Sequence, residues 1–136
     1  MTNEEWIALG RRAVACKGWR WEPGMLCAWE SVRVEEGGRV GDRLYIIGHG
    51  SNGHVDRVAD SRFDIPGLSD PATLGCLLSL VRGAWGDAML SPSVFAVNKQ
   101  GAAVEWTVMG VERGGAFTVY GATEAEALVA ALEKAP

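Results

Sequence analysis

Apolar residues recur at helical spacing in three segments of the chain, which predicts three α-helices. The segment from residue 70 to 86 has the strongest pattern. Its apolar positions follow an i, i+3, i+4, i+7 rhythm and comprise Leu74, Leu77, Leu78, Val81, Ala84 and Trp85. Asp70 is a good N-cap, Pro71 suits the first helical position, and Gly86 suits the end of the helix. We therefore expect a central helix between Asp70 and Gly86.

The other two predicted helices each begin with a Thr-x-x-Glu capping box, in which the hydroxyl and the carboxylate satisfy backbone N–H groups. Thr2 and Glu5 open a helix over residues 2–17, which Gly18 is expected to end. Thr123 and Glu126 open the last helix. The apolar residues that this last helix should turn inward are Ala125, Leu128, Val129 and Leu132.

Between the helices the pattern is typical of β-strands. Residues 26–34, 43–47 and 54–58 are compatible with strands, and Asn52-Gly53 predicts a hairpin over residues 43–59. Residues 93–120 predict a three-stranded meander, with turns at 99–101 and 112–115. The order of elements predicts an α+β fold. We expect a single compact domain over residues 1–136, in which antiparallel sheet, in two hairpin or meander sections, is packed by three helices.

The composition is that of a globular protein and excludes several partners. Of 136 residues, 48% are apolar and 22% charged, and the net charge of -4 argues against broad nucleic-acid binding. The three cysteines form no Cys-x-x-Cys pair, which favours reduced thiols. The start of the chain has no signal-peptide pattern, and no apolar run is long enough to span a membrane. We expect a cytoplasmic protein with no membrane partner.

Two motifs resemble ligand sites but have simpler explanations. Residues 48–53 match G-x-G-x-x-G, yet the residues that follow lack a helical apolar stripe and soon reach Pro66 and Gly67. The Asn-Gly hairpin explains these glycines. Cys16, Cys27, His49 and His54 could supply zinc ligands, but the cysteines lie too far apart in sequence for the usual zinc knuckle. We predict no cofactor and no metal.

The sequence contains no recognisable arrangement of catalytic residues. Cys76 lies in a leucine-rich helix, where a small buried apolar role is expected. His49, Ser51 and Asp56 are too close along the chain for a triad, whose members normally converge from distant elements. We predict no catalytic residue and favour a binding protein over an enzyme. A small hydrolase, in which His49, His54 and a carboxylate converge, is the weaker alternative.

The stretch CKGWRWEPGM, residues 16–25, is the strongest candidate binding segment. From Trp6 to Trp21 the chain contains four basic residues and no acidic one. Indoles can stack on a base, and guanidinium groups can bind phosphate. The predicted ligand-binding residues, for an anionic nucleotide-like molecule, are Trp19, Trp21, Arg11, Arg12, Lys17 and Arg20. The burial typical of tryptophan favours a different interpretation, in which the indoles fill a core junction between the first helix and the sheet beneath a solvated cationic rim, and a third is a protein-binding hot spot.

Segments at both ends and in the middle of the chain resemble a family of small uncharacterised proteins encoded by tailed phages and prophages. They are MTNEEWIALGRRAV, DPATLGCLLSLVRGAWGD and GATEAEALVAALEKAP; residues 30–65 lie outside the resemblance. The family brings no known catalytic residues. It implies a bacterial cytoplasm during infection, where small non-enzymatic phage proteins often inhibit host defences. The helix followed by GWRWEPGM and a strand is also similar to phage proteins that sequester cyclic nucleotide immune signals.

These observations together favour a phage-encoded, non-enzymatic counter-defence protein. It would either sequester a nucleotide signal or occlude a host defence protein. A nucleotide sponge of this kind should be a homo-oligomer. The alternative is a structural or regulatory phage protein that binds its partner through an exposed apolar surface.

Overall fold

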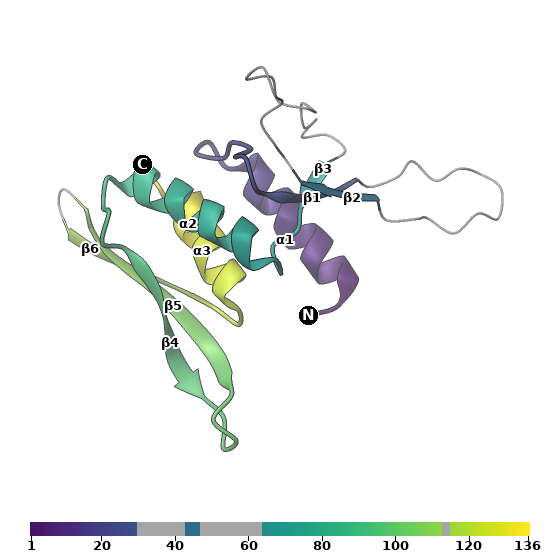
Figure 1. The fold of residues 1–136 in the computed structure, drawn as a ribbon. Coiled ribbons are helices and arrows are strands. Elements are labelled where there is room, and N and C mark those ends of the chain that lie inside the picture. Colours follow the sequence, from purple (N-terminus) through teal and green to yellow (C-terminus); the bar gives the residue numbers. More distant parts are fainter. Residues whose placement is uncertain (30–42, 47–63, 113–114) are drawn as a thin grey trace. The chain divides into compact units, whose positions relative to one another are not determined.

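The computed structural model describes residues 1–29, 43–46, 64–112 and 115–136 (Figure 1). In chain order its elements are α1 (Asn3–Ala15), β1 (Leu26–Trp29), β2 (Arg43–Ile46), β3 (Asp64–Pro66), α2 (Pro71–Trp85), β4 (Ser91–Val97), β5 (Ala103–Glu112), β6 (Gly115–Gly121) and α3 (Glu124–Glu133). The three helices and the antiparallel sheets confirm the predicted α+β class. No helix within these ranges is long and apolar enough to cross a membrane.

The chain divides into two compact units. The first comprises Met1–Val14 and Arg20–Cys76, and the second comprises Ala15–Trp19 and Leu77–Pro136. Helix α2 begins in the first unit and continues into the second. The expectation of one domain over residues 1–136 therefore stays a prediction.

The sheet of the first unit has the strand order β2-β1-β3 and is antiparallel throughout. Ala28 lies at its centre, between Leu44 on β2 and Ile65 on β3. The strand predicted at 43–47 is thus present as β2, paired with β1. Its predicted hairpin return at 54–58 and the Asn52-Gly53 turn lie outside the described residues. Strand β3 was not predicted.

Helix α1 carries the predicted capping box and lies very close to β3. Thr2 Oγ1 accepts a hydrogen bond from the Glu5 N–H at 3.2 Å, and the Glu5 carboxylate accepts one from the Thr2 N–H. The helix ends at Ala15, two residues before the predicted end at 17. At Gly10 a Cβ atom would collide with Ile65 Cγ2, so the absence of a side chain there is what allows this close approach.

A buried hydroxyl joins the first turn of α2 to the start of β1. The Asp70 carboxylate accepts hydrogen bonds from both the N–H and the Oγ1 of Thr73, each at 2.8 Å, which confirms Asp70 as the N-cap. Thr73 Oγ1 in turn accepts one from the Leu26 N–H at 2.8 Å. Because Thr73 is fully buried, these bonds are shielded from water. They fix where β1 begins relative to the helix.

The second unit is the predicted meander with helix α3 packed against it (Figure 1). All four predicted inward residues of α3 are buried: Ala125, Leu128, Val129 and Leu132. They lie on the same side of the sheet as its buried residues Val108 and Val119. Trp85, at the end of α2, stacks on Phe117 with ring centroids 3.8 Å apart. Its Nε1 donates a hydrogen bond to the Ala131 carbonyl at 2.8 Å, so the end of α2 contacts both α3 and β6.

The turn glycines and helix-capping residues predicted from the sequence are present in this unit. Gly86 ends α2 with φ +65°, and Gly101 has φ +80° in the β4–β5 turn. Thr123 caps α3 by accepting a hydrogen bond from the Glu126 N–H at 3.2 Å. The Glu126 carboxylate accepts from the Ala122 N–H at 2.8 Å, one residue before the predicted position. The middle of the turn predicted at 112–115 lies outside the described residues.

Candidate functional site

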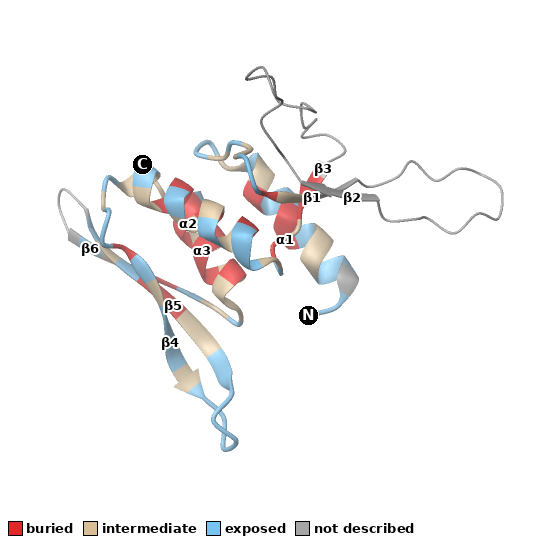
Figure 2. Cartoon of the chain, viewed as in Figure 1, coloured by how far each residue is buried: buried red, intermediate tan, exposed pale blue. Residues whose placement is uncertain are grey.

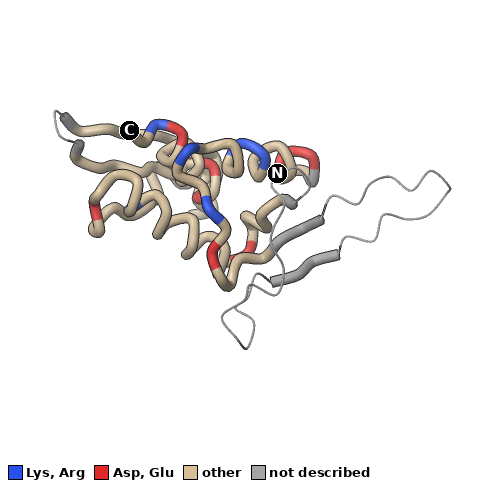
Figure 3. Tube along the Cα trace, turned by 90° about the horizontal axis from the view of Figure 1, so that it is seen from above, with Lys and Arg blue, Asp and Glu red and all other residues tan. Residues whose placement is uncertain are grey.

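The six predicted ligand-binding residues are divided between the two units. Arg11, Arg12, Arg20 and Trp21 belong to the first unit, and Lys17 and Trp19 to the second. All four basic residues are exposed, whereas both tryptophans are partly buried. Figure 3 shows basic positions along α1 and the segment that follows it. Both the ligand-site and the packing interpretations expect exposed cations, so the use of these residues as a ligand site stays a prediction.

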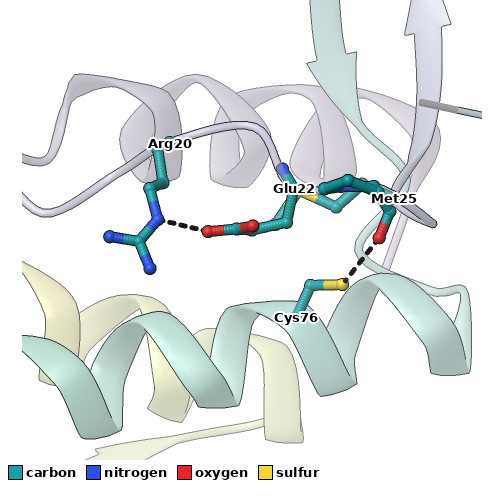
Figure 4. A network of polar contacts seen from close by, with 5 residues as sticks. Arg20, Glu22, Met25 and Cys76 are labelled. Atoms are coloured by element: carbon teal, nitrogen blue, oxygen red, sulfur yellow. Dashed lines mark hydrogen bonds and ion pairs between the residues drawn. The ribbon is translucent and has the colours of Figure 1, made fainter. Parts of the chain in front are cut away.

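Arg20 is already paired with a carboxylate of its own chain. Its Nε donates to Glu22 Oε1, and Figure 4 shows the two side chains pointing toward each other. The Arg20 side chain is 74% exposed, and exposed ion pairs of this kind stabilise a protein weakly. A phosphate group could displace Glu22, but it would have to compete with that carboxylate. Glu22 directly follows the stretch from Trp6 to Trp21 that contains no acidic residue.

The indole rings of Trp19 and Trp21 have their N–H groups shielded from solvent. The Nε1 atoms of Trp19 and Trp21 are buried. The Trp19 backbone N–H donates to the Cys16 carbonyl at 3.0 Å, which closes the turn after α1. Covered ring edges agree with the packing alternative, since partly buried tryptophans contribute large apolar area to a core.

Cys76 lacks the properties of a nucleophile. Its Sγ donates to the Pro23 carbonyl at 3.8 Å (Figure 4). Burial raises the pKa of the Cys76 thiol, and the negative charges of Glu22 and Asp70 raise it further. A raised pKa keeps the thiol protonated at neutral pH, whereas a nucleophilic cysteine requires a lowered one.

Among the residues that the structure describes, no group of three or more His, Cys, Asp or Glu side chains lies close enough together to hold a metal ion. The G-x-G-x-x-G match and the histidines at 49 and 54 lie outside those residues.

The most distinctive surface of the second unit is an apolar sheet face that sequence analysis did not locate. We define the outer face by four side chains of the meander: Phe95, Met109, Val111 and Tyr120. They are exposed by 59%, 58%, 74% and 50%, respectively. In Figure 2 this sheet carries long exposed stretches beside a narrow buried band.

Strand alternation and register place these four residues on one side of the sheet. Thr107, Met109 and Val111 follow one another at intervals of two residues on β5 and therefore lie on one side of the sheet. Thr107 pairs with Tyr120 of β6, which places Tyr120 on the same side. Phe95 contacts the Tyr120 ring edge to face, with centroids 5.1 Å apart. Val108, between Thr107 and Met109, is fully buried and points to the opposite side, which α3 covers.

The outer face is apolar and large enough to be significant. The four side chains expose an area on the order of 500 Å², a size at which apolar patches on monomers are often functional. Strands β4 and β6 contain no charged residue. From Val108 to Val111 strand β5 is apolar on both sides, with Val108 on one and Met109 and Val111 on the other, and Glu105 is the charged residue on the outer side nearer its start. That pattern is typical of strands covered on both faces, and it was the sequence signal that could have located this surface.

Comparison with known proteins gives no relative: no protein-family profile, no curated protein and no solved structure matches the chain. The fold and the outer face together define an α+β protein with an apolar sheet face open to solvent.

Proposed function

We propose that this chain is a phage-encoded, non-enzymatic protein that acts in counter-defence by occluding a protein of the bacterial host. The observation that carries the proposal is the outer face, because α3 covers one side of the meander whereas Phe95, Met109, Val111 and Tyr120 are exposed on the other. The resemblance of its three segments to small phage and prophage proteins supports the biological setting.

The chemistry of the outer face suits binding. Three of its four side chains, Phe95, Met109 and Val111, have no group that could transfer a proton or attack a substrate, and the fourth, Tyr120, carries a phenol that can also form a hydrogen bond to a partner. Aromatic residues and methionine are enriched in protein interfaces, where their apolar area is desolvated on association. A protein partner with an apolar patch of similar size would cover the surface that α3 leaves open.

Charge placed on the outer face should weaken the counter-defence activity strongly. Expression of the chain should let a phage form plaques on cells whose defence system otherwise blocks it. We expect Met109→Lys and Val111→Lys each to lower the number of these plaques at least tenfold, because a lysine would have to be desolvated in the interface. The measurement is phage plating on a strain that carries the targeted defence system and expresses the chain. Gln100→Lys, in the exposed β4–β5 turn, is the control with the same charge change.

Circular dichroism and urea unfolding should show that all three variants are folded. Plating by Met109→Lys and Val111→Lys at the level of the unsubstituted chain would contradict the proposal.

A second candidate function is sequestration of a nucleotide signal, favoured by the exposure of all four predicted basic residues. Calorimetry against a panel of cyclic nucleotides tests it. We expect saturable binding that weakens at least tenfold in Lys17→Ala and survives in Trp21→Phe, which keeps an aromatic ring. An absence of binding heat across the panel, with Trp21→Ala simply unfolding the protein, would leave only the packing role.

A further inference from the structure

We propose that two copies of the chain pair antiparallel through β6, edge to edge. The product is one continuous sheet that joins the two β4-β5-β6 meanders. Strand β6 lies at an edge of its sheet, and no further strand pairs with it among the residues that the structure describes. The free edge of a strand offers a row of backbone N–H and C=O groups to a second chain.

The two edges of the meander differ in how they are protected. Strand β4 has Pro92 near its start and irregular pairing with β5 between Val94 and Val97. Proline and β-bulges are devices by which proteins prevent edge-to-edge pairing. Strand β6 pairs with β5 in unbroken register from Gly115 to Gly121, and it has no proline and no charged residue. Strand β6 is therefore the edge that is open to pairing.

The sequence of β6 is complementary to itself. A two-fold axis at Thr118 places Thr118 of the two copies opposite each other. It also places Ala116 opposite Tyr120, and Phe117 opposite Val119. A threonine pair and an aromatic residue facing a β-branched one, as Phe117 faces Val119, are favourable cross-strand neighbours. Each copy has a net charge of -4, and like charges placed opposite each other would oppose pairing, so the absence of charged residues from β6 favours it as the contact strand.

Pairing about this axis also enlarges the outer face. The two-fold axis between antiparallel strands is perpendicular to the sheet, so the outer faces of both copies lie on the same side. Their combined apolar area is about 1,000 Å², the scale at which specific protein interfaces begin. This consequence rests on the proposed function, whereas the pairing itself does not.

Light scattering coupled to size-exclusion chromatography tests the pairing on the full chain over a concentration series. We expect the mass of a dimer, and we expect Thr118→Lys to halve it, because the two lysines would face each other at the axis. The matched control is Ser93→Lys on β4. Ser93 is also exposed and lies on the same side of the sheet as Thr118, so this variant should remain dimeric.

Oxidation provides a second test that does not depend on the folding of a charged variant. Residues opposite each other in an antiparallel pair have Cα atoms about 4.5 to 5.5 Å apart, within disulfide range. We expect Thr118→Cys to form a covalent dimer under mild oxidation and Ser93→Cys to form none. The native cysteines are present in both variants, so any covalent dimer that they form would appear equally in both.

A chain that is monomeric at every concentration would overturn the pairing. So would a dimer that Ser93→Lys dissociates and Thr118→Lys does not, because that result would place the contact on β4. Met109→Lys and Val111→Lys lie on the central strand and should keep the dimer mass. A stable dimer without plating activity would therefore overturn only the proposed function.

Discussion

Gly121→Ala is expected to lower the free energy of unfolding by about 3 kcal/mol, because the first turn of α3 lies directly against this residue. A Cβ atom at Gly121 would collide with the Ala127 backbone nitrogen and come within 2.8 Å of the Glu126 carbonyl carbon. These are backbone atoms of a helix whose apolar side is buried on the sheet, so rotation of a side chain cannot relieve the collision. Urea unfolding followed by circular dichroism measures the loss.

Gly83→Ala is the matched control in the same unit. Gly83 lies in α2 with open space around its Cα, and alanine is the better helix former. We expect this variant to gain about 0.5 to 1 kcal/mol. Equal stabilities of the two variants would show that α3 does not approach β6 as described.

Thr73→Val should cost about 2 kcal/mol, because it leaves the Leu26 N–H without its hydroxyl acceptor in a buried position. The variant has nearly the same shape, so packing changes little and the loss reports on the hydrogen bonds. It also removes the hydroxyl that donates to Asp70 at the N-cap of α2. Thermal unfolding and urea unfolding both measure the effect.

Thr73→Ser separates the hydroxyl from the methyl group. Serine keeps both hydrogen bonds and loses one buried methyl, which should cost about 1 kcal/mol. A valine variant as stable as the unsubstituted protein would mean that the Leu26 N–H finds another acceptor.

The candidate binding segment was only partly accessible to sequence reasoning. The exposure of its cations follows from their charge and was anticipated. The ion pair between Arg20 and Glu22 and the burial of the Trp19 and Trp21 Nε1 atoms depend on how the chain turns after α1. Charge counting along the sequence could not supply that turn.

The sequence by itself determined the local elements. The capping residues Thr2, Asp70 and Thr123, the terminating Gly86 and the three strands of the meander are all present, because each depends on neighbours within a few residues. Their signals act through local hydrogen bonds and backbone angles, which do not need the rest of the fold.

Only the tertiary structure decided which apolar residues are covered. Val108 and Met109 are adjacent on β5 and similar in hydrophobicity, yet one is fully buried and the other is 58% exposed. The difference arises because α3 packs on one side of the sheet, and a period-two pattern that is apolar on both sides does not say which side that is. The outer face, like the hydroxyl of Thr73 between β1 and α2, is defined by contacts between residues far apart in the sequence.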